Sequence, residues 1–159
     1  MNELLATLGQ DSSLFGYLLI DMAVAIILLG GMRYTMGMIG KVNTNEELAI
    51  KDNFAYGISM AGGVAAMGVA LSGTIAGELA GSYWIEFVGM LSYGFAGLVM
   101  IKAGRYIHDK LALPEFNKHE QILQRNISVA IVDAASVIAT AIVVRAALIW
   151  VEGLNIKTF

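Results

Sequence analysis

Four apolar stretches, each long enough to cross a lipid bilayer as a helix, constrain this 159-residue chain more than any other feature. They cover residues 14–36, 54–79, 85–107 and 127–151, and a spanning helix needs roughly 20 residues. The stretches are continuously apolar rather than alternating, which excludes the strands of a membrane barrel. Only 14% of the residues are charged, which is not typical of a soluble domain. We therefore predict an all-α membrane protein with four transmembrane helices, forming a single domain over residues 1–159.

An internal repeat accompanies these spans. Residues 44–66 and 117–139 match at an offset of 73 positions, the difference between 117 and 44. The matched pairs are Thr44 and Asn117, Glu47 and Glu120, Asn53 and Asn126, and Ile58, Ala61, Val64 and Ala66 with Ile131, Ala134, Val137 and Ala139. Each repeat, about 14–79 and about 85–151, crosses the membrane twice. Two copies that cross an even number of times face the same way, so we predict two parallel-oriented two-helix repeats related by an axis along the membrane normal.

The basic residues indicate an orientation. Eight of the ten follow the first or the third span. They are Arg33, Lys41, Lys51, Lys102, Arg105, Lys110, Lys118 and Arg125. Because cytoplasmic connections are enriched in lysine and arginine, both basic connections are predicted to be cytoplasmic and both termini to lie outside.

Each basic connection also carries a helix-start pattern. Thr44 is followed three residues later by Glu47, and Asn117 by Glu120, the arrangement of a capping box. We expect one or two polar helical turns that run straight into the next span, with Asn53 and Asn126 at the cytoplasmic entrance. Three interpretations of these asparagines stay open: simple polarity at a helix entry, a paired polar ring at a pore entrance, or a docking point for a cytoplasmic partner.

Residues 47–58 read Glu-Leu-Ala-x-Lys-Asp-Asn-x-Ala-x-x-Ile and are followed by a glycine-rich helix and a weaker second copy. This pattern resembles the YjfL family of bacterial inner-membrane proteins, catalogued as domain of unknown function 350. The second copy departs from it, with Gln124-Arg125 where the first has Lys51-Asp52. The resemblance covers nearly the whole chain and implies a small four-helix protein of the bacterial inner membrane. In that membrane, the orientation predicted from the basic residues places both termini in the periplasm. No established activity comes with it. Members often appear beside envelope-maintenance proteins, which implies a role in membrane integrity.

Two charges lie at similar depth from the outer ends of their spans, Asp21 in the first and Arg145 in the fourth. A carboxylate inside a membrane costs a few kcal/mol unless it is paired, hydrated or protonated. We interpret the two residues as an ion pair that joins the first and fourth helices. The alternatives are a proton or cation site at Asp21, or a headgroup-level aspartate without a special role.

A polar stripe follows one face of the fourth span, where Asp133, Ser136 and Thr140 are spaced by three and four residues. In a helical bundle such a stripe usually forms hydrogen bonds between helices, and the alternative is that it lines a hydrated path. Lys102, at comparable depth in the third span, is predicted to neutralise Asp133.

The second span is rich in glycine, and Gly73, Gly77 and Gly81 recur every four residues. Small residues let helix backbones approach closely, which is a main source of association in lipid. We predict that this helix is the most buried one and packs on another helix or on a neighbouring subunit. The alternative is a broken helix that lines an ion site.

No phosphate-binding loop, nucleophile with a neighbouring base, zinc signature or basic nucleic-acid-binding face is present in the sequence. We therefore expect no enzyme activity, no cofactor, no metal site and no nucleic-acid partner.

The predicted function is a structural or adaptor component in envelope maintenance, which acts as a homo-oligomer in the lipid bilayer through its basic connections. A cytoplasmic or membrane-associated protein, or anionic lipid headgroups, are the expected partners. The alternative is a small ion or proton channel, or a proton-coupled transporter, that uses the intramembrane carboxylates.

Overall fold

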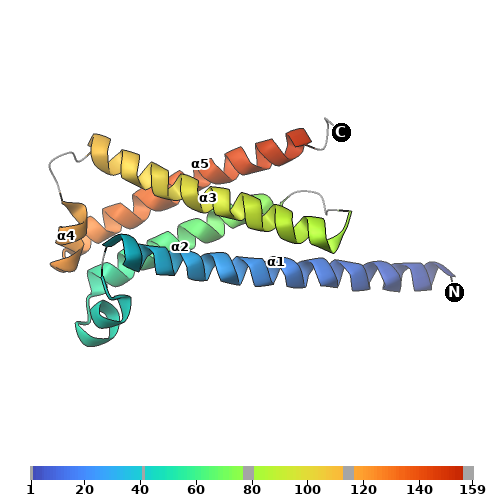
Figure 1. Cartoon of the computed structure of the whole chain (residues 1–159), viewed down its shortest axis with the longest axis horizontal. Helices are drawn as coiled ribbons and strands as arrows, with labels where there is room; N and C mark the ends of the chain where they lie inside the picture. The colour runs from blue at the N-terminus through green and yellow to red at the C-terminus, as the bar shows by residue number, and fades with distance from the viewer. Residues whose placement is uncertain (1, 41, 77–80, 113–116, 156–159) are drawn as a thin grey trace.

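Four long helices form a bundle in the computed structural model, which describes residues 2–40, 42–76, 81–112 and 117–155 (Figure 1). They are α1 (Asn2–Gly40), α2 (Phe54–Thr74), α3 (Tyr83–Ala112) and α5 (Ile127–Asn155). Each contains a stretch apolar and long enough to cross a membrane: Leu14–Met38, Phe54–Thr74, Tyr83–Leu111 and Ile127–Trp150. The described residues contain no strand. The predicted all-α, multi-pass membrane architecture is confirmed.

The helices differ from the predicted spans mainly at their ends. Helix α2 ends at Thr74, where its hydroxyl donates a hydrogen bond to the carbonyl of Leu71 at 2.8 Å, rather than continuing through the apolar residues that follow. Helix α3 continues past Ile107 to Ala112, because a helix does not have to end where its apolar face ends.

Two short helical segments precede α2 and α5, the π-helical turn η1 (Glu46–Ile50) and the helix α4 (Lys118–Leu123). Our prediction that they run unbroken into the spans was wrong. The residues Asp52 and Arg125 have left-handed backbone angles, with φ of 49° and 67°. The asparagine after each of them begins a new helix, because a side-chain oxygen that accepts a backbone N–H is more favourable at a helix start than in a helix interior.

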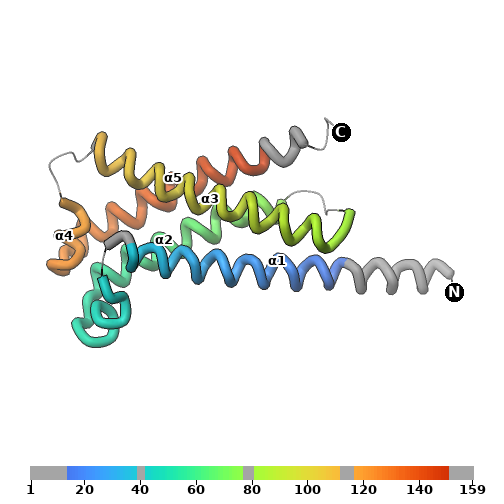
Figure 2. The backbone as a smooth tube through the Cα atoms, in the orientation of Figure 1, coloured from blue at the N-terminus to red at the C-terminus, as the bar shows by residue number. Residues whose placement is uncertain are grey.

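The chain passes four times along the long axis of the bundle (Figure 2). Helices α1 and α3 run towards the end that carries η1 and α4, which we call the connection end, and α2 and α5 run away from it (Figure 1). Contacts between α2 and α5 follow this direction. Ser59 contacts Asp133 near the connection end, and Ser72 contacts Arg145 further along. The residue numbers therefore increase in the same direction in both helices, which means that α2 and α5 are parallel.

The core of the bundle is built from all four long helices. Its buried residues are Val24, Leu28, Met32 and Met36 of α1, Ala66, Met67, Ala70 and Leu71 of α2, Met90, Leu98 and Ile101 of α3, and Val137, Ala141, Val144 and Leu148 of α5. Half of the most apolar window of α2 is buried, against 28% or less in the other three helices. The prediction that α2 is the most buried helix is therefore confirmed. Large apolar side chains such as Leu18, Phe95 and Val143 point outward, as expected where lipid surrounds the protein.

Candidate functional site

The connection end contains a buried ionic cluster centred on Asp133 of α5, whose side chain is completely buried. Lys118 Nζ lies 2.5 Å from Asp133 Oδ1, and Arg105 Nη2 lies 2.5 Å from Asp133 Oδ2. Ser59 Oγ also donates a short hydrogen bond to Oδ2. A buried carboxylate is tolerated only when it is paired and hydrogen-bonded. These contacts meet that requirement and join α2, α3, α4 and α5.

Local structure brings each partner to the carboxylate. Arg105 lies one turn after the buried Ile101 of α3, on the same face of that helix. Lys118 is the first residue of α4, where Asn117 caps the helix by accepting the Glu120 N–H at 3.2 Å, as the sequence predicted. Lys118 Nζ also lies 2.5 Å from Asp109 Oδ1, so the cluster continues to the last turns of α3.

The predicted partner of Asp133 was wrong in part. Lys102 is near enough for its charge to interact with Asp133, but its ammonium makes no ion pair within 4 Å to any described carboxylate. Arg105 and Lys118 take that place, and sequence reasoning had assigned both only to the basic connections. Arg105 follows the buried Ile101 by one helical turn, and this spacing could have identified Arg105 from the sequence. No signal in the sequence identified Lys118, because α4 is positioned by tertiary packing.

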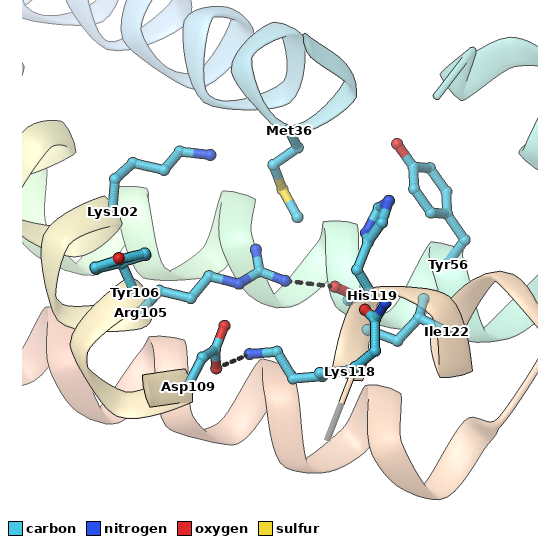
Figure 3. Close-up of a pocket in the computed structure, with 11 residues that line it drawn as sticks. Met36, Tyr56, Lys102, Arg105, Tyr106, Asp109, Lys118, His119 and Ile122 are labelled. Carbon is cyan, nitrogen blue, oxygen red and sulfur yellow. Dashed lines mark hydrogen bonds and ion pairs between the residues drawn. The ribbon is translucent and has the colours of Figure 1, made fainter. Parts of the chain in front are cut away.

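A cavity of about 470 Å³ opens beside the ionic cluster (Figure 3). Its polar lining includes Lys102, Arg105, Lys118, His119 and Asp109. The remaining lining residues are Met36, Tyr56, Ser59, Tyr106, Asn117 and Ile122. In Figure 3, Lys102 and Arg105 extend from α3 across the cavity, and Lys118 and His119 come from α4. The described lining of the cavity is therefore predominantly basic, and Asp109 is the acidic residue among the described residues that line it.

Asp21 and Arg145 do not form the predicted ion pair. Arg145 Nε donates a hydrogen bond to Ser72 Oγ at 2.8 Å, on the exposed side of α2. Asp21 is buried, and Glu86 of α3 is the charged residue that interacts with it. Similar depth in the membrane did not imply contact, because α5 presents Arg145 to α2 rather than to α1.

The polar stripe of α5 is only partly a contact between helices. Asp133 makes the contacts described above, but Ser136 Oγ donates to the carbonyl of Asp133 and Thr140 Oγ1 to the carbonyl of Ser136, both at 2.9 Å. These two hydroxyls are therefore bonded within their own helix.

Asn53 and Asn126 start α2 and α5. Asn53 Oδ1 accepts the Tyr56 N–H at 3.1 Å, and Asn126 Oδ1 accepts the Val129 N–H at 3.3 Å. Asn53 is almost completely buried and its amide group also donates to Glu47 Oε2 at 3.0 Å and to the Ile122 carbonyl at 3.2 Å. Of the three interpretations, helix entry is the one these contacts favour, and Asn53 in addition joins η1 to α4.

Glu47 is the second residue of η1, outside the spanning segments. Its carboxylate accepts a hydrogen bond from Lys51 Nζ at 2.8 Å as well as the one from Asn53. The bond from Lys51 lowers the pKa of Glu47, and the same bond raises the pKa of Lys51. Both interactions favour the charged form of Glu47, and the bond from Asn53 connects η1 to the start of α2.

The predicted glycine stripe is confirmed only at Gly73. Gly73 is buried, and a Cβ atom there would lie 2.9 Å from the carbonyl oxygen of Arg145. Gly81 is exposed, and a Cβ atom added there would meet nothing within 4 Å, so its predicted packing role was wrong. The physical reason is that α2 ends at Thr74, so the helical spacing does not continue. Gly77 lies outside the described residues.

Comparison with known proteins gives a family. Residues 5–148 match the family model described as Domain of Unknown Function (DUF350). No curated protein and no solved structure matches the chain. The match covers most of the 159 residues, and the chain therefore belongs to the DUF350 family.

Proposed function

We propose that this protein is a structural or adaptor component of the bacterial inner membrane, active in envelope maintenance, whose working face is the connection end. The observation that carries this proposal is the simultaneous contact of Asp133 with Arg105, Lys118 and Ser59. Removing one partner of such a buried group costs about 3–5 kcal/mol, so the carboxylate is committed to holding four elements together. A carboxylate in that role is poorly suited to exchanging protons or cations.

The hydroxyls of Ser136 and Thr140 support the same proposal. Each donates to a carbonyl of its own helix, so neither offers its proton to a water-filled path. In the polar stripe, Ser136 and Thr140 are therefore hydrogen-bonded within α5, and Asp133 is paired with side chains of α2, α3 and α4.

One observation favours the alternative of a small channel or proton-coupled transporter. Asp21 is buried beside a second carboxyl group, that of Glu86, and Asp21 Oδ1 has no hydrogen-bond partner among the described residues. Intramembrane carboxyl groups of this kind are often functional. The channel hypothesis accordingly rests on Asp21 and not on Asp133.

Complementation separates the two functions. The gene is deleted in the native host, and variants are tested for restoring growth under detergent stress on the envelope. We expect Asp21→Asn to complement fully. The variant Glu120→Ala, at an exposed position of α4 that does not line the cavity, is expected to fail at wild-type membrane abundance. Failure of Asp21→Asn together with full activity of the α4 variant would favour the channel.

We also propose that the fold is a duplicated helical hairpin. The left-handed residues Asp52 and Arg125 lie 73 positions apart, as do the capping asparagines after them. The inward faces of α1 and α3 match at the same offset. Their positions are Asp21, Val24, Leu28, Met32 and Met36 against Gly94, Gly97, Ile101, Arg105 and Asp109. An experimental structure in which α1–α2 fails to superpose on α3–α5 by rotation about the membrane normal would contradict the duplication.

The proposed orientation places the connection end in the cytoplasm and the termini in the periplasm. The chain has no cysteine, so single cysteines report directly on sidedness. A membrane-impermeant maleimide is expected to label Ser82→Cys in intact spheroplasts and Asn45→Cys only after permeabilisation, both positions being exposed. The reverse pattern would invert the topology.

We further propose a homo-oligomer. Only 11% of the most apolar window of α1 is buried within the chain, so this helix has most of its surface left for contact with a second copy. Native mass spectrometry in mild detergent is expected to detect assemblies, and a monomer alone would contradict the proposal.

A further inference from the structure

We propose that the cavity at the connection end binds the phosphate group of an anion. This inference rests on the proposed function and deepens it, because it names the chemistry that the working face recognises. The ligand class comprises anionic lipid headgroups and free phosphate esters, which share the charged group that the cavity would contact.

The balance of charge in the cavity carries the inference. Three basic side chains contribute to it, Lys102, Arg105 and Lys118, against the carboxylates of Asp109 in the lining and of Asp133 in the ionic cluster. Lys118 and Arg105 are paired with those carboxylates. The ammonium of Lys102 is half-buried and has no carboxylate within 4 Å among the described residues. A half-buried ammonium group that is not paired with a carboxylate favours the binding of an anion.

The donors around Lys102 suit phosphate. The bonds from Arg105 to Asp133 and Ser59 both come from Nη2, and a guanidinium has five N–H donors, so its other nitrogens keep donors for a ligand. Arginine and lysine together are the usual recognition groups for phosphate oxygens. The cavity of about 470 Å³ also falls in the range of small-molecule sites, roughly 300–1,000 Å³.

The lining of the cavity and its position in the bundle are compatible with both sources of phosphate, a lipid headgroup and a soluble phosphate ester. Met36, Tyr106 and Ile122 supply apolar surface beside the cations. The cavity lies near the last turns of the third span, which ends at Leu111, where headgroups of one leaflet are expected. A phosphodiester of an anionic lipid and a soluble phosphate ester could each reach it.

The equivalent region of the first half of the chain lacks these charges. At the repeat offset of 73, Lys102, Arg105, Asp109 and Asp133 correspond to Leu29, Met32, Met36 and Met60. The first half of the chain thus builds the equivalent region from apolar side chains, of which Met32 and Met36 are buried. Lys102 has Leu29 at the equivalent position and pairs with no described carboxylate, so its charge is better explained by a ligand than by packing.

Thermal unfolding of the purified protein in neutral detergent tests the inference, because a ligand that binds the folded state raises its melting temperature with concentration. One arm titrates short-chain phosphatidylglycerol against short-chain phosphatidylcholine. The other titrates glycerol 3-phosphate against sodium chloride at equal ionic strength. Lys102→Gln removes a cation without breaking an ion pair, and Arg33→Gln is the matched control, because Arg33 is exposed and does not line this cavity.

We expect at least one phosphate anion to raise the melting temperature of the wild-type protein and of Arg33→Gln. In Lys102→Gln the half-saturating concentration should rise about tenfold, the effect of losing roughly one charge-assisted contact. Stabilisation by phosphatidylglycerol alone identifies a lipid headgroup, and stabilisation by glycerol 3-phosphate identifies a soluble ester. No stabilisation in either arm, or equal half-saturation in Lys102→Gln, overturns the inference. The complementation result for α4 would then stand unaffected, so the two proposals fail separately.

Discussion

Asp133 is the residue on which the connection end depends most. Its carboxylate is completely buried, and its contacts come from side chains of three other elements. A charge in such a place is stable only as part of a complete network, because an unpaired partner keeps the full cost of desolvation. The residue therefore acts through Arg105 and Lys118 rather than alone.

A double-mutant cycle measures this coupling. Asp133→Asn and Arg105→Gln are each expected to lower the free energy of unfolding by about 3–5 kcal/mol, since each leaves a buried charge without its partner. The double variant should lose less than the sum, with a coupling energy of at least about 1 kcal/mol. Unfolding is followed by circular dichroism in mixed micelles with increasing detergent denaturant. The exposed Lys110→Gln serves as control, with a change within about 0.5 kcal/mol. Strictly additive losses would mean that the two side chains do not interact.

Sequence reasoning identified Asp133 as a polar residue inside a span, but not the partners that surround it. The reason is geometric. The periodicity of one helix specifies its own faces, and it does not specify which neighbour each face meets. Lys102 and Asp133 have similar depth, as do Asp21 and Arg145, yet neither pair is an ion pair in the structure.

At the scale of elements, the close contact of α2 with α5 depends on glycine. A Cβ atom at Gly62 would lie 2.6 Å from Ala134 Cα and in steric overlap with the Ala134 side chain. Because backbone atoms cannot move aside locally, a larger residue must push the two helices apart. Gly68, on the same helix, has nothing within 4 Å of the corresponding position.

These two glycines form a matched pair for mutation. Gly62→Ala is expected to lower the free energy of unfolding by about 1–3 kcal/mol through overpacking. Gly68→Ala should cause no loss and a gain of up to about 1 kcal/mol, because alanine favours helix more than glycine does. The same unfolding assay in mixed micelles compares them. Equal effects of the two substitutions would show that close packing at Gly62 does not hold α2 against α5.

The elements themselves were the most predictable part of the fold. Continuous apolar stretches identified all four spans, and the glycine content of α2 indicated its burial. The breaks at Asp52 and Arg125 were missed, although Asn53 and Asn126 were noted in the sequence. An asparagine suits both a polar helix surface and a helix start, and only the left-handed residue before it decides between them.

Across the bundle as a whole, the two halves of the chain differ in the chemistry of their side chains. The second half carries the ionic cluster and the basic cavity, and the first half has methionine and leucine at the corresponding positions. If the chain is a duplicated hairpin, as we propose, one copy has changed its side chains at the connection end. Asp21, a buried acidic residue of the first half, lies in α1.

We propose that Asp133 holds the bundle together through its ion pairs and that neither Asp133 nor Asp21 conducts ions or protons. Ion and proton flux into liposomes that contain the purified protein tests it most directly, under a membrane potential and under a pH gradient. We expect flux no greater than that of empty liposomes for the wild-type protein and for Asp21→Asn and Asp133→Asn alike. Flux by the wild-type protein that either variant abolishes while remaining folded would show that the protein conducts and would identify that carboxylate as the conducting group.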